Sequence, residues 1–325
     1  MNTVGIDITD CRYLVVSGGV GGAKLALGLY LELSGEELLV IGNVGDDFKH
    51  WGLHISPDLD TLMYTLAGVA DPDRGWGRAE ESWTVLETLS DIGGIDWFRL
   101  GDRDLAIHLE RTVRINDGES LSTVTRRLCQ ALGVTATLVP PTDSAVRTMV
   151  ETADRTLSFQ EYFVRERCEP TVTRLQYQGA SQAKLLPEIS ELLTRPELTA
   201  VILTPSNPYL SLDPILEIAD LRQRLATSPA PVVAVSPLIQ SRAFKGPTAK
   251  IMKELGFEVS TLTIAQHYSD VLDGIVIDSA DYELSNAIEN LGIKVWITDT
   301  DMANEQAKRR LAAEVISFSE TIARK

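Results

Sequence analysis

A glycine-rich turn between a strand-like and a helix-like segment constrains the fold of this 325-residue chain more than any other feature. Residues 12–17 (RYLVVS) are mostly apolar and predict a short buried strand, and residues 23–33 predict an amphipathic helix. Between them stand four glycines, Gly18, Gly19, Gly21 and Gly22. Nucleotide-binding βα units begin in this way, because glycine lets backbone N–H groups approach a phosphate at the positive end of the helix. Lys24 would add a cation, and a tight turn without a ligand is the alternative.

Strand-like and helical patterns alternate along most of the remaining chain. Further strands are predicted at residues 37–43, 135–139, 199–203, 231–235, 274–277 and 294–298. Helices are predicted at residues 105–112, 120–132, 216–226, 248–255 and 304–316. This alternation predicts an α/β fold, with a Rossmann-like, mostly parallel sheet and helices on both faces.

One region departs from this alternation. Residues 146–190 contain short β-like pieces and predict an inserted, smaller α+β region. Residues 1–145 and 191–325 would then form a single Rossmann-like ligand-binding domain, with residues 1–10 as an additional tail.

The composition excludes several classes of protein. A hydrophobic content of 44% is ample for a buried core, and a formal net charge of -16 argues against a nucleic-acid-binding face. The three cysteines form no C-x-x-C pair, so a zinc site or a disulfide framework is not expected. The polar N-terminus lacks the pattern of a signal peptide, and no apolar run is long enough to span a membrane. We therefore expect a cytoplasmic protein.

Acidic residues follow the second predicted strand, where ligands of open α/β sheets bind. Asp46 and Asp47 come directly after it, and Asp58 and Asp60 lie in the SPDLDT segment that starts the next helix. Carboxylates at this place suit a hard cation such as Mg²⁺, or they could orient an attacking hydroxyl. The structural alternative is that Asp58 caps the helix and that Asp46 and Asp47 are solvated.

A dense polar turn, RLGDRD, precedes the helix predicted at residues 105–112. Arg99 and Arg103 could bind a phosphate or carboxylate through two hydrogen bonds each, and Asp102 lies between them. Asp104 would cap the helix, and we interpret His108 as structural.

Two more polar loops follow predicted strands. The TPSNP loop, with Ser206 and Asn207, follows residues 199–203, and the VSPL loop follows residues 231–235, with FKGP a few residues later. Loops after successive parallel strands converge at one edge of the sheet, so a composite nucleotide site is expected there.

Taken together, these motifs define a resemblance. GGVGGAKLA, NVGDDF, SPDLDT, LGDRDLA-x-H, LSFQEYFV, PSNP, VSPL and KGP stand in the order of the 2-phospho-L-lactate transferase family, which the chain resembles from about residue 13 to residue 302. The resemblance implies a transferase of coenzyme F-420 biosynthesis. Its acceptor would be FO, a 5-deazaflavin with a ribityl chain. Its donor would be a guanosine diphosphate ester of lactate, enolpyruvate or glycerate, and GMP would leave.

The resemblance also implies roles for residues. Asp60 and Arg99 would contact the deazaflavin, with Asp102 and Arg103 beside them, in the same domain that binds the nucleotide. Nucleotide phosphates would bind at the glycine turn, Lys24, Ser206 and Asn207. Asp46 and Asp60 would hold Mg²⁺ and act in catalysis, in a homodimer.

Two alternatives remain at this point. An NAD(P)-dependent oxidoreductase would explain the glycine turn but not the PDLDT, GDRD and PSNP loops. A non-catalytic relative would not need the aspartate pair. If the transferase interpretation is right, Asp60→Asn should abolish turnover without changing the melting temperature. Asp58→Asn should cost about 1 kcal/mol as a lost helix cap.

Overall fold

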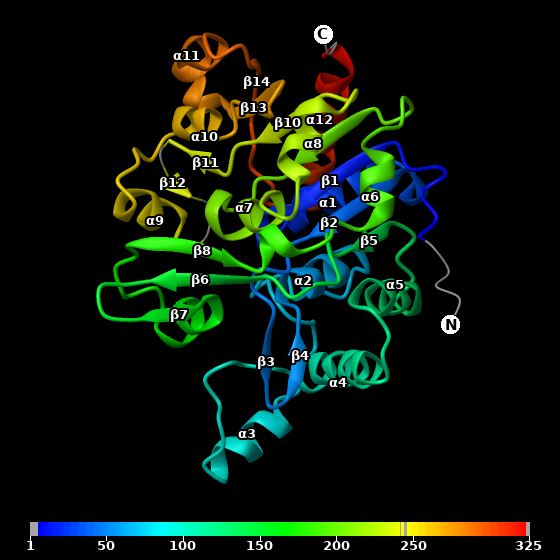
Figure 1. Cartoon of the computed structure of the whole chain (residues 1–325), viewed down its shortest axis with the longest axis vertical. Helices are drawn as coiled ribbons and strands as arrows, with labels where there is room; N and C mark the ends of the chain where they lie inside the picture. Colours follow the sequence, from blue (N-terminus) through cyan, green and yellow to red (C-terminus); the bar gives the residue numbers. More distant parts are fainter. Residues whose placement is uncertain (1–5, 241, 244–245, 323–325) are drawn as a thin grey trace.

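A seven-stranded sheet lies at the centre of the computed structural model, which describes residues 6–240, 242–243 and 246–322 (Figure 1). All its strands are parallel, in the order β14-β13-β10-β9-β1-β2-β5. The strands are β1 (Tyr13–Ser17), β2 (Leu38–Gly42), β5 (Thr137–Val139), β9 (Ala200–Leu203), β10 (Val232–Val235), β13 (Gly274–Asp278) and β14 (Lys294–Thr298). Each overlaps a predicted strand, so the Rossmann-like α/β class is confirmed. The chain builds outward from β1 in one direction and then from β9 in the other, which makes the β1–β9 boundary the switch point where ligands of such sheets bind.

Helices cover both faces of the sheet because neighbouring strand residues point to opposite sides. Val15 packs in one core and Val16 in the other. The core that contains Val15 includes residues of α1 (Gly19–Glu32), α2 (Pro57–Leu66), α5 (Leu121–Ala131) and α12 (Glu305–Thr321). The opposite core includes residues of α6 (Pro187–Leu192), α7 (Asp213–Leu216), α8 (Leu221–Thr227), α9 (Thr248–Glu254), α10 (Thr261–His267) and α11 (Ser285–Glu289).

Two predicted helices differ from the structure. Helix α1 begins at Gly19, about one turn before the predicted start. The helix predicted at residues 216–226 is divided into α7 and α8, because Ala219 has a left-handed backbone with φ of 51°. No α-helix continues through a residue in that conformation.

The crossover from β2 to β5 carries elements that the sequence did not predict. These are an antiparallel hairpin of β3 (Phe48–His50) and β4 (Leu53–Ile55), which precedes α2, and helix α3 (Thr84–Asp91), which follows it. Helix α4 (Asp102–Asn116) contains the helix predicted at residues 105–112. In Figure 1 the hairpin and α3 extend away from the central sheet at the lower end of the molecule. This crossover supplies many of the residues of the cavity described below.

A second, small sheet lies in the region predicted as an insertion. It contains β6 (Arg147–Glu151), β7 (Thr156–Ser158) and β8 (Arg174–Gln178), all antiparallel, in the order β7-β6-β8. A π-helical turn, η2 (Glu161–Arg165), follows β7. Helix α6 begins inside the predicted region but packs in a core of the main sheet. The proposed division into two regions stays a prediction.

The remaining short elements complete the chain. They are the hairpin of β11 (Leu238–Ile239) and β12 (Arg242–Ala243), the 3₁₀ segments η1 (Gly35–Glu37), η3 (Ala180–Gln182) and η5 (Ser279–Leu284), and the π-helical turn η4 (Pro208–Leu212). Of the predicted N-terminal tail, residues 1–5 lie outside the described residues, whereas Ile6 and Ile8 are buried in the core. No helix in the described ranges is long and apolar enough to cross a membrane.

Candidate active site

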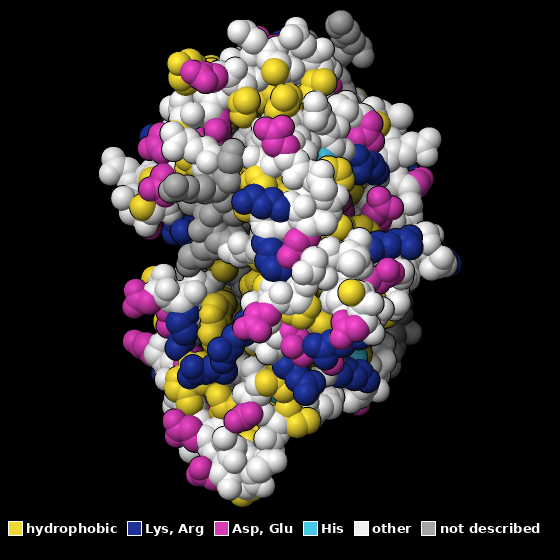
Figure 2. All heavy atoms as spheres, turned by 90° about the vertical axis from the view of Figure 1, so that its left-hand side faces the viewer, with side chains coloured by type: hydrophobic (Ala, Val, Ile, Leu, Met, Phe, Trp, Pro, Cys, Tyr) yellow, Lys and Arg dark blue, Asp and Glu magenta, His cyan; other side chains and the backbone are white. Residues whose placement is uncertain are grey.

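A cavity of about 720 Å³ opens at the carboxyl ends of the central strands. Its walls come from the loops after β1, β2, β9, β10 and β14, from α2 and α4, and from the segment that follows β7 in the inserted region. Many residues singled out in the sequence line it together: Gly18, Gly19, Gly21, Lys24, Asp46, Asp60, Arg99, Ser206 and Asn207. Although the net charge is -16, Lys and Arg side chains gather in the lower half of the face shown in Figure 2. Basic side chains are therefore concentrated on part of this face.

The glycine turn packs directly against the TPSNP loop. The Gly18 N–H donates to Ser206 Oγ at 3.1 Å, and the Ser206 hydroxyl donates to the Gly18 carbonyl at 2.7 Å. Gly22 lies behind this contact, and a Cβ atom there would lie 2.4 Å from Ser206 Oγ and 2.5 Å from Ser17 Oγ. Gly22 therefore allows the two loops to meet, and it is not among the described residues that line the cavity.

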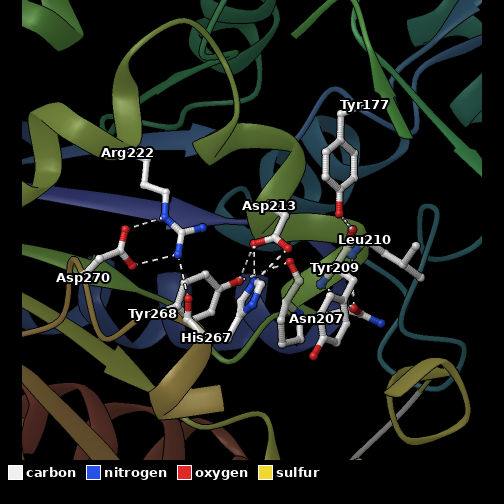
Figure 3. A network of polar contacts seen from close by, with 10 residues as sticks. Tyr177, Asn207, Tyr209, Leu210, Asp213, Arg222, His267, Tyr268 and Asp270 are labelled. Atoms are coloured by element: carbon white, nitrogen blue, oxygen red, sulfur yellow. Dashed lines mark hydrogen bonds and ion pairs between the residues drawn. The ribbon is translucent and has the colours of Figure 1, made fainter. Parts of the chain in front are cut away.

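The turn after Asn207 is fixed by hydrogen bonds (Figure 3). Asn207 Oδ1 accepts from the N–H groups of Tyr209 at 3.0 Å and Leu210 at 3.1 Å, which caps the π-helical turn η4. The Tyr177 hydroxyl, from the inserted sheet, donates to the Tyr209 carbonyl at 2.7 Å. The side-chain oxygen of Asn207 is thus used inside the loop, so its predicted ligand contact would come from other atoms of the loop.

A second set of contacts holds the far side of the same turn (Figure 3). Asp213 lies 2.9 Å from His267 Nε2 and accepts from the Tyr268 hydroxyl at 3.0 Å. Arg222 pairs with Asp270 at 2.8 Å and donates to the His267 carbonyl at 2.6 Å. The turn that follows the TPSNP loop is therefore anchored through Asp213 to the end of α10, which Arg222 of α8 holds in turn.

One group of acidic side chains gathers around Asn43 and forms no close ion pair among the described residues. Asn43 Nδ2 donates to Asp58 at 3.0 Å and to Asp46 at 3.4 Å, and Gln160 donates to Asp46 at 3.4 Å. Burial and the charges of Asp58 and Asp47 raise the pKa of Asp46 well above its usual range. Burial also raises the pKa of Asp58 to about 6 and that of Asp47 to about 7. Among the described residues, no ion pair within 4.0 Å involves Asp46 or Asp58.

The predicted capping role of Asp58 is wrong. Helix α2 begins at Pro57, with Ser56 as its N-cap residue, so Asp58 lies inside the first turn and points to the Asn43 group. Proline favours the first helical position because its φ angle is already helical. The Ser56 hydroxyl donates to Asp47 at 2.9 Å.

A second group of acidic side chains is compensated by a buried arginine. Arg111 Nη1 donates to Asp60 Oδ2 at 3.0 Å, and Nη2 donates to the other carboxylate oxygen. His108 Nε2 lies 3.2 Å from Asp104, which also accepts from the Tyr64 hydroxyl at 2.6 Å. Burial alone would raise the pKa of Asp104, but its contacts with His108 and Tyr64 hold it below the usual range. Asp104 is therefore not the predicted helix cap, because α4 begins at Asp102 after Gly101.

The sequence analysis missed Arg111, although its spacing gave a signal. Asp104, His108 and Arg111 are separated by four and three residues on one helix, which is the spacing of side chains on one helix face. The sequence also gave His108 a purely structural reading, but it lines the cavity. Ligand atoms of Asp60, Asp104 and His108 lie within 4.8 Å of one another. The Arg111 guanidinium already compensates Asp60, so this group is poorly suited to hold a second cation.

The polar turn before α4 divides into residues inside and outside the cavity. Arg99 lines the cavity, and its guanidinium carbon lies 4.6 Å from the centre of the Trp83 ring. Asp102 instead accepts from the N–H groups of Thr84 and Val85, both at 3.1 Å, at the start of α3. Arg103 pairs with Glu80 at an exposed position. The structure thus brings Arg99 to the cavity but does not bring Asp102 and Arg103 there.

Aromatic side chains form a large part of the cavity wall, and the sequence analysis did not single them out. Those that line it are Tyr64, Trp76, Trp97, Phe98, Phe159 and Phe163. Trp97 and Phe98 belong to a cluster with the β3–β4 hairpin, in which the Phe98 and Phe48 rings meet edge to face at 4.8 Å. Phe159 and Phe163 of the inserted region stack at 5.3 Å. These rings offer flat apolar surfaces beside the acidic groups.

The fold and the cavity together define the class of protein. A cavity at the switch point of a Rossmann-like sheet, with a glycine turn at the start of a helix, is typical of α/β enzymes that bind nucleotides. Over residues 14–316 the chain matches the family described as 2-phospho-L-lactate transferase CofD, and it belongs to this family. It is accordingly a transferase of the phospholactate and phosphoenolpyruvate transferase type, which disfavours the oxidoreductase alternative.

Relatives match almost the whole chain. A phosphoenolpyruvate transferase of Kitasatospora aureofaciens is 36% identical over 318 residues, which cover 96% of this chain and 98% of the relative. A 2-phospho-L-lactate transferase of Methanosarcina mazei is 36% identical over 303 residues, which cover 93% and 99%. A solved structure of a UPF0052 family protein from Bacillus halodurans has a TM-score of 0.60 at 15% identity, over 96% of this chain and 100% of that chain. At that identity the structural similarity supports the fold alone.

Proposed function

We propose that this protein transfers a phospho-acid group from a guanosine diphosphate ester to the terminal ribityl hydroxyl of the deazaflavin FO, in coenzyme F-420 biosynthesis. The acid is lactate, enolpyruvate or glycerate, and GMP is the second product. The names of the relatives support a phospholactate or phosphoenolpyruvate donor group.

The proposal rests mainly on one observation: the cavity has one wall of polar groups and another of aromatic side chains. The glycine turn, the start of α1 and the TPSNP loop offer N–H and hydroxyl groups, which suit a diphosphate. The aromatic side chains and Arg99 suit a planar ring with polar edges. The buried aspartates lie in the wall of the same cavity, where a phosphate and a hydroxyl would meet.

The group around Asn43 fits Mg²⁺ better than the predicted pair of Asp46 and Asp60. Asp46 and Asp58 are buried oxygen donors that form no ion pair within 4.0 Å among the described residues, and the more distant charge of Arg147 does not prevent the raised pKa of Asp46. Asp60 is paired with Arg111. We therefore assign Mg²⁺ to Asp46 and Asp58, where the ion when bound would neutralise charge on the diphosphate.

The chain's own residues would act by positioning. The acceptor hydroxyl attacks the phosphorus that carries the acid, a new P–O bond forms, the bond to the GMP oxygen breaks, and the hydroxyl proton leaves through its hydrogen bond to Asp60. Asp60 orients this hydroxyl by accepting its hydrogen bond, and the glycine turn binds the leaving phosphate. Such phosphoryl chemistry depends mainly on alignment and neutralised charge.

The direct test is a reaction with FO, GTP, Mg²⁺ and a guanylyltransferase that makes the donor from each of the three phospho-acids. Mass spectrometry should detect FO with an added phospho-acid, together with GMP in equal amount, for at least one acid. Consumption of no FO with any of the three donors would contradict the proposal.

GDP with Mg²⁺ is expected to raise the melting temperature of the protein. A ligand that binds only the folded state stabilises it by about 2.7 kcal/mol at a hundredfold excess over its dissociation constant. The measurement is a thermal shift at millimolar GDP, with ADP and NADH as controls. An equal shift with NADH would contradict a guanosine nucleotide site.

Gly22→Ala is expected to weaken GDP binding about tenfold and to lower stability by about 1–3 kcal/mol, as overpacking does. The added Cβ would overlap Ser206 Oγ and Ser17 Oγ, so the two phosphate-facing loops must separate. Calorimetric titration with GDP measures the effect. Gly133→Ala is the control, because Gly133 has a left-handed backbone but open space around it, and it should lose stability without losing GDP affinity.

The cytoplasmic location and the homodimer belong to the proposal on the strength of the resemblance. Light scattering of the purified protein tests the dimer.

A further inference from the structure

Arg111 is a fully buried arginine, with no exposed surface. A guanidinium in such a place needs partners for its charge and its N–H groups. The two Nη groups of Arg111 find them in both carboxylate oxygens of Asp60 and in His108 Nδ1, which lies 3.1 Å from Nη1, whereas Nε has no hydrogen-bond partner among the described residues. Arg111 and Asp60 are 51 positions apart in the chain. The fold must therefore bring them together in one orientation.

The cavity and the arginine lie on different sides of Asp60. Asp60, His108, Asp104 and Tyr64 line the cavity, whereas Arg111 is not among the described residues that do so. The guanidinium therefore contacts the Asp60 carboxylate on the side that faces away from the cavity. Each carboxylate oxygen keeps a second lone pair, which can accept from a ligand.

The contacts fix the direction of hydrogen bonding through the group. A guanidinium only donates, so His108 Nδ1 must accept from Arg111. The other ring nitrogen, Nε2, lies 3.2 Å from the Asp104 carboxylate without forming a hydrogen bond to it. The Tyr64 hydroxyl donates to the same carboxylate at 2.6 Å. Hydrogen bonds from Arg111 and Tyr64 thus orient the carboxylates of Asp60 and Asp104.

We propose that Arg111 is a positioning residue for the acceptor substrate: it holds the Asp60 carboxylate at a fixed angle toward the cavity, as the acceptor of a polyol hydroxyl. This inference rests on the proposed function. It separates the acidic residues into two roles. Asp60, whose charge is compensated by Arg111, orients an alcohol. Asp46 and Asp58, which have no such ion pair among the described residues, bind the cation.

The alternative hypothesis is that Arg111 only stabilises the fold. The two hypotheses predict different kinetic constants for a variant of Arg111. A positioning residue should affect the KM of the hydroxyl-bearing acceptor and kcat, because a displacement of about 1 Å can cost about a hundredfold in rate. A purely structural residue should lower the amount of folded protein and leave the kinetic constants of the folded fraction unchanged.

The test is steady-state kinetics of Arg111→Lys with FO as acceptor, together with FO binding measured by fluorescence. Lysine keeps the positive charge but cannot bond both carboxylate oxygens in one plane. We expect kcat/KM for FO to fall about a hundredfold, with weaker FO binding and a donor KM within about twofold of the wild type. The matched control is Arg114→Lys, one turn further along α4, where the arginine pairs with Glu110 and Glu119. It should change neither constant by more than about twofold.

Circular dichroism and melting curves establish the folded fraction of each variant. If Arg111→Lys does not fold, Asp60→Glu tests the same geometry, because it keeps both charges and moves the carboxylate by one methylene. It should show the same selective loss for FO. Unchanged FO kinetics in a folded Arg111→Lys protein would overturn the inference. The same result in Asp60→Glu would overturn it where that variant is used instead. In either case, transfer by the wild type would still support the proposed function. A wild type that neither binds FO nor transfers to it would overturn both.

Discussion

Replacing Asp60 by asparagine is expected to lower transfer to FO by about a hundredfold or more and to destabilise the fold by about 3 kcal/mol. The first effect follows from the place of Asp60 in the cavity wall, where it would accept the hydrogen bond of the attacking hydroxyl. The second follows from Arg111, which is fully buried and would lose its charged partner. Turnover and urea unfolding measure the two effects.

The sequence alone predicted that Asp60→Asn would leave the melting temperature unchanged, and the contact with Arg111 reverses that expectation. Asp102→Asn is the control, because Asp102 is also an aspartate of the family motifs but bonds the start of α3 outside the cavity. It should keep turnover within a few-fold of the wild type. An Asp60→Asn protein of wild-type stability would show that the buried pair contributes nothing to folding.

Much of the fold could be predicted because strands of a parallel sheet are short apolar runs. The segments RYLVVS and KVWIT are runs of this kind, and each correctly predicted a strand. The hairpin of β3 and β4 was missed, because its residues FKH and LHI are short and half polar. The start of helix α1 was predicted one turn too late, because its first turn contains glycines, which are poor helix formers.

The site was harder to predict than the fold, because its specificity comes from long-range contacts. The strand-end loops could be placed together from the order of the strands, and Gly18, Asp46 and Ser206 do line one cavity. The order of the strands could not show that the aspartates form two groups with different partners. This division depends on Asn43 reaching Asp58 and on Arg111 reaching Asp60, and those pairs are 15 and 51 positions apart in the chain.

Asp58→Asn is expected to have opposite effects on stability and on activity. At pH 8 and without divalent metal, the variant should be more stable than the wild type by up to about 3 kcal/mol, the free energy that corresponds to a pKa of about 6 in place of about 4. Asparagine can still accept the hydrogen bond from Asn43 Nδ2, and it removes a buried charge next to Asp46. The sequence had predicted a loss of stability, on the wrong assumption that Asp58 caps α2.

The pH dependence provides the internal control. A carboxyl with a raised pKa binds more protons in the folded state than in the unfolded state, so its contribution to stability falls as the pH rises from about 4 to about 6. The gain from Asp58→Asn should therefore be small near pH 4, grow up to about pH 6 and then stay level. Asp117→Asn, at an exposed position that ends α4, should change stability by no more than about 0.5 kcal/mol at any of these pH values.

The same substitution should reduce Mg²⁺-dependent transfer by about a hundredfold or more, because an amide is a weaker ligand for a hard cation than a carboxylate. It should also abolish the rise in melting temperature that we expect Mg²⁺ to give the wild type. A buried charge that lowers stability and is needed for turnover is the expected compromise at a catalytic site. If Asp58→Asn gained stability but kept full activity with Mg²⁺, the cation would have to be assigned to other residues, with Asp46 and Asp47 the next pair to test.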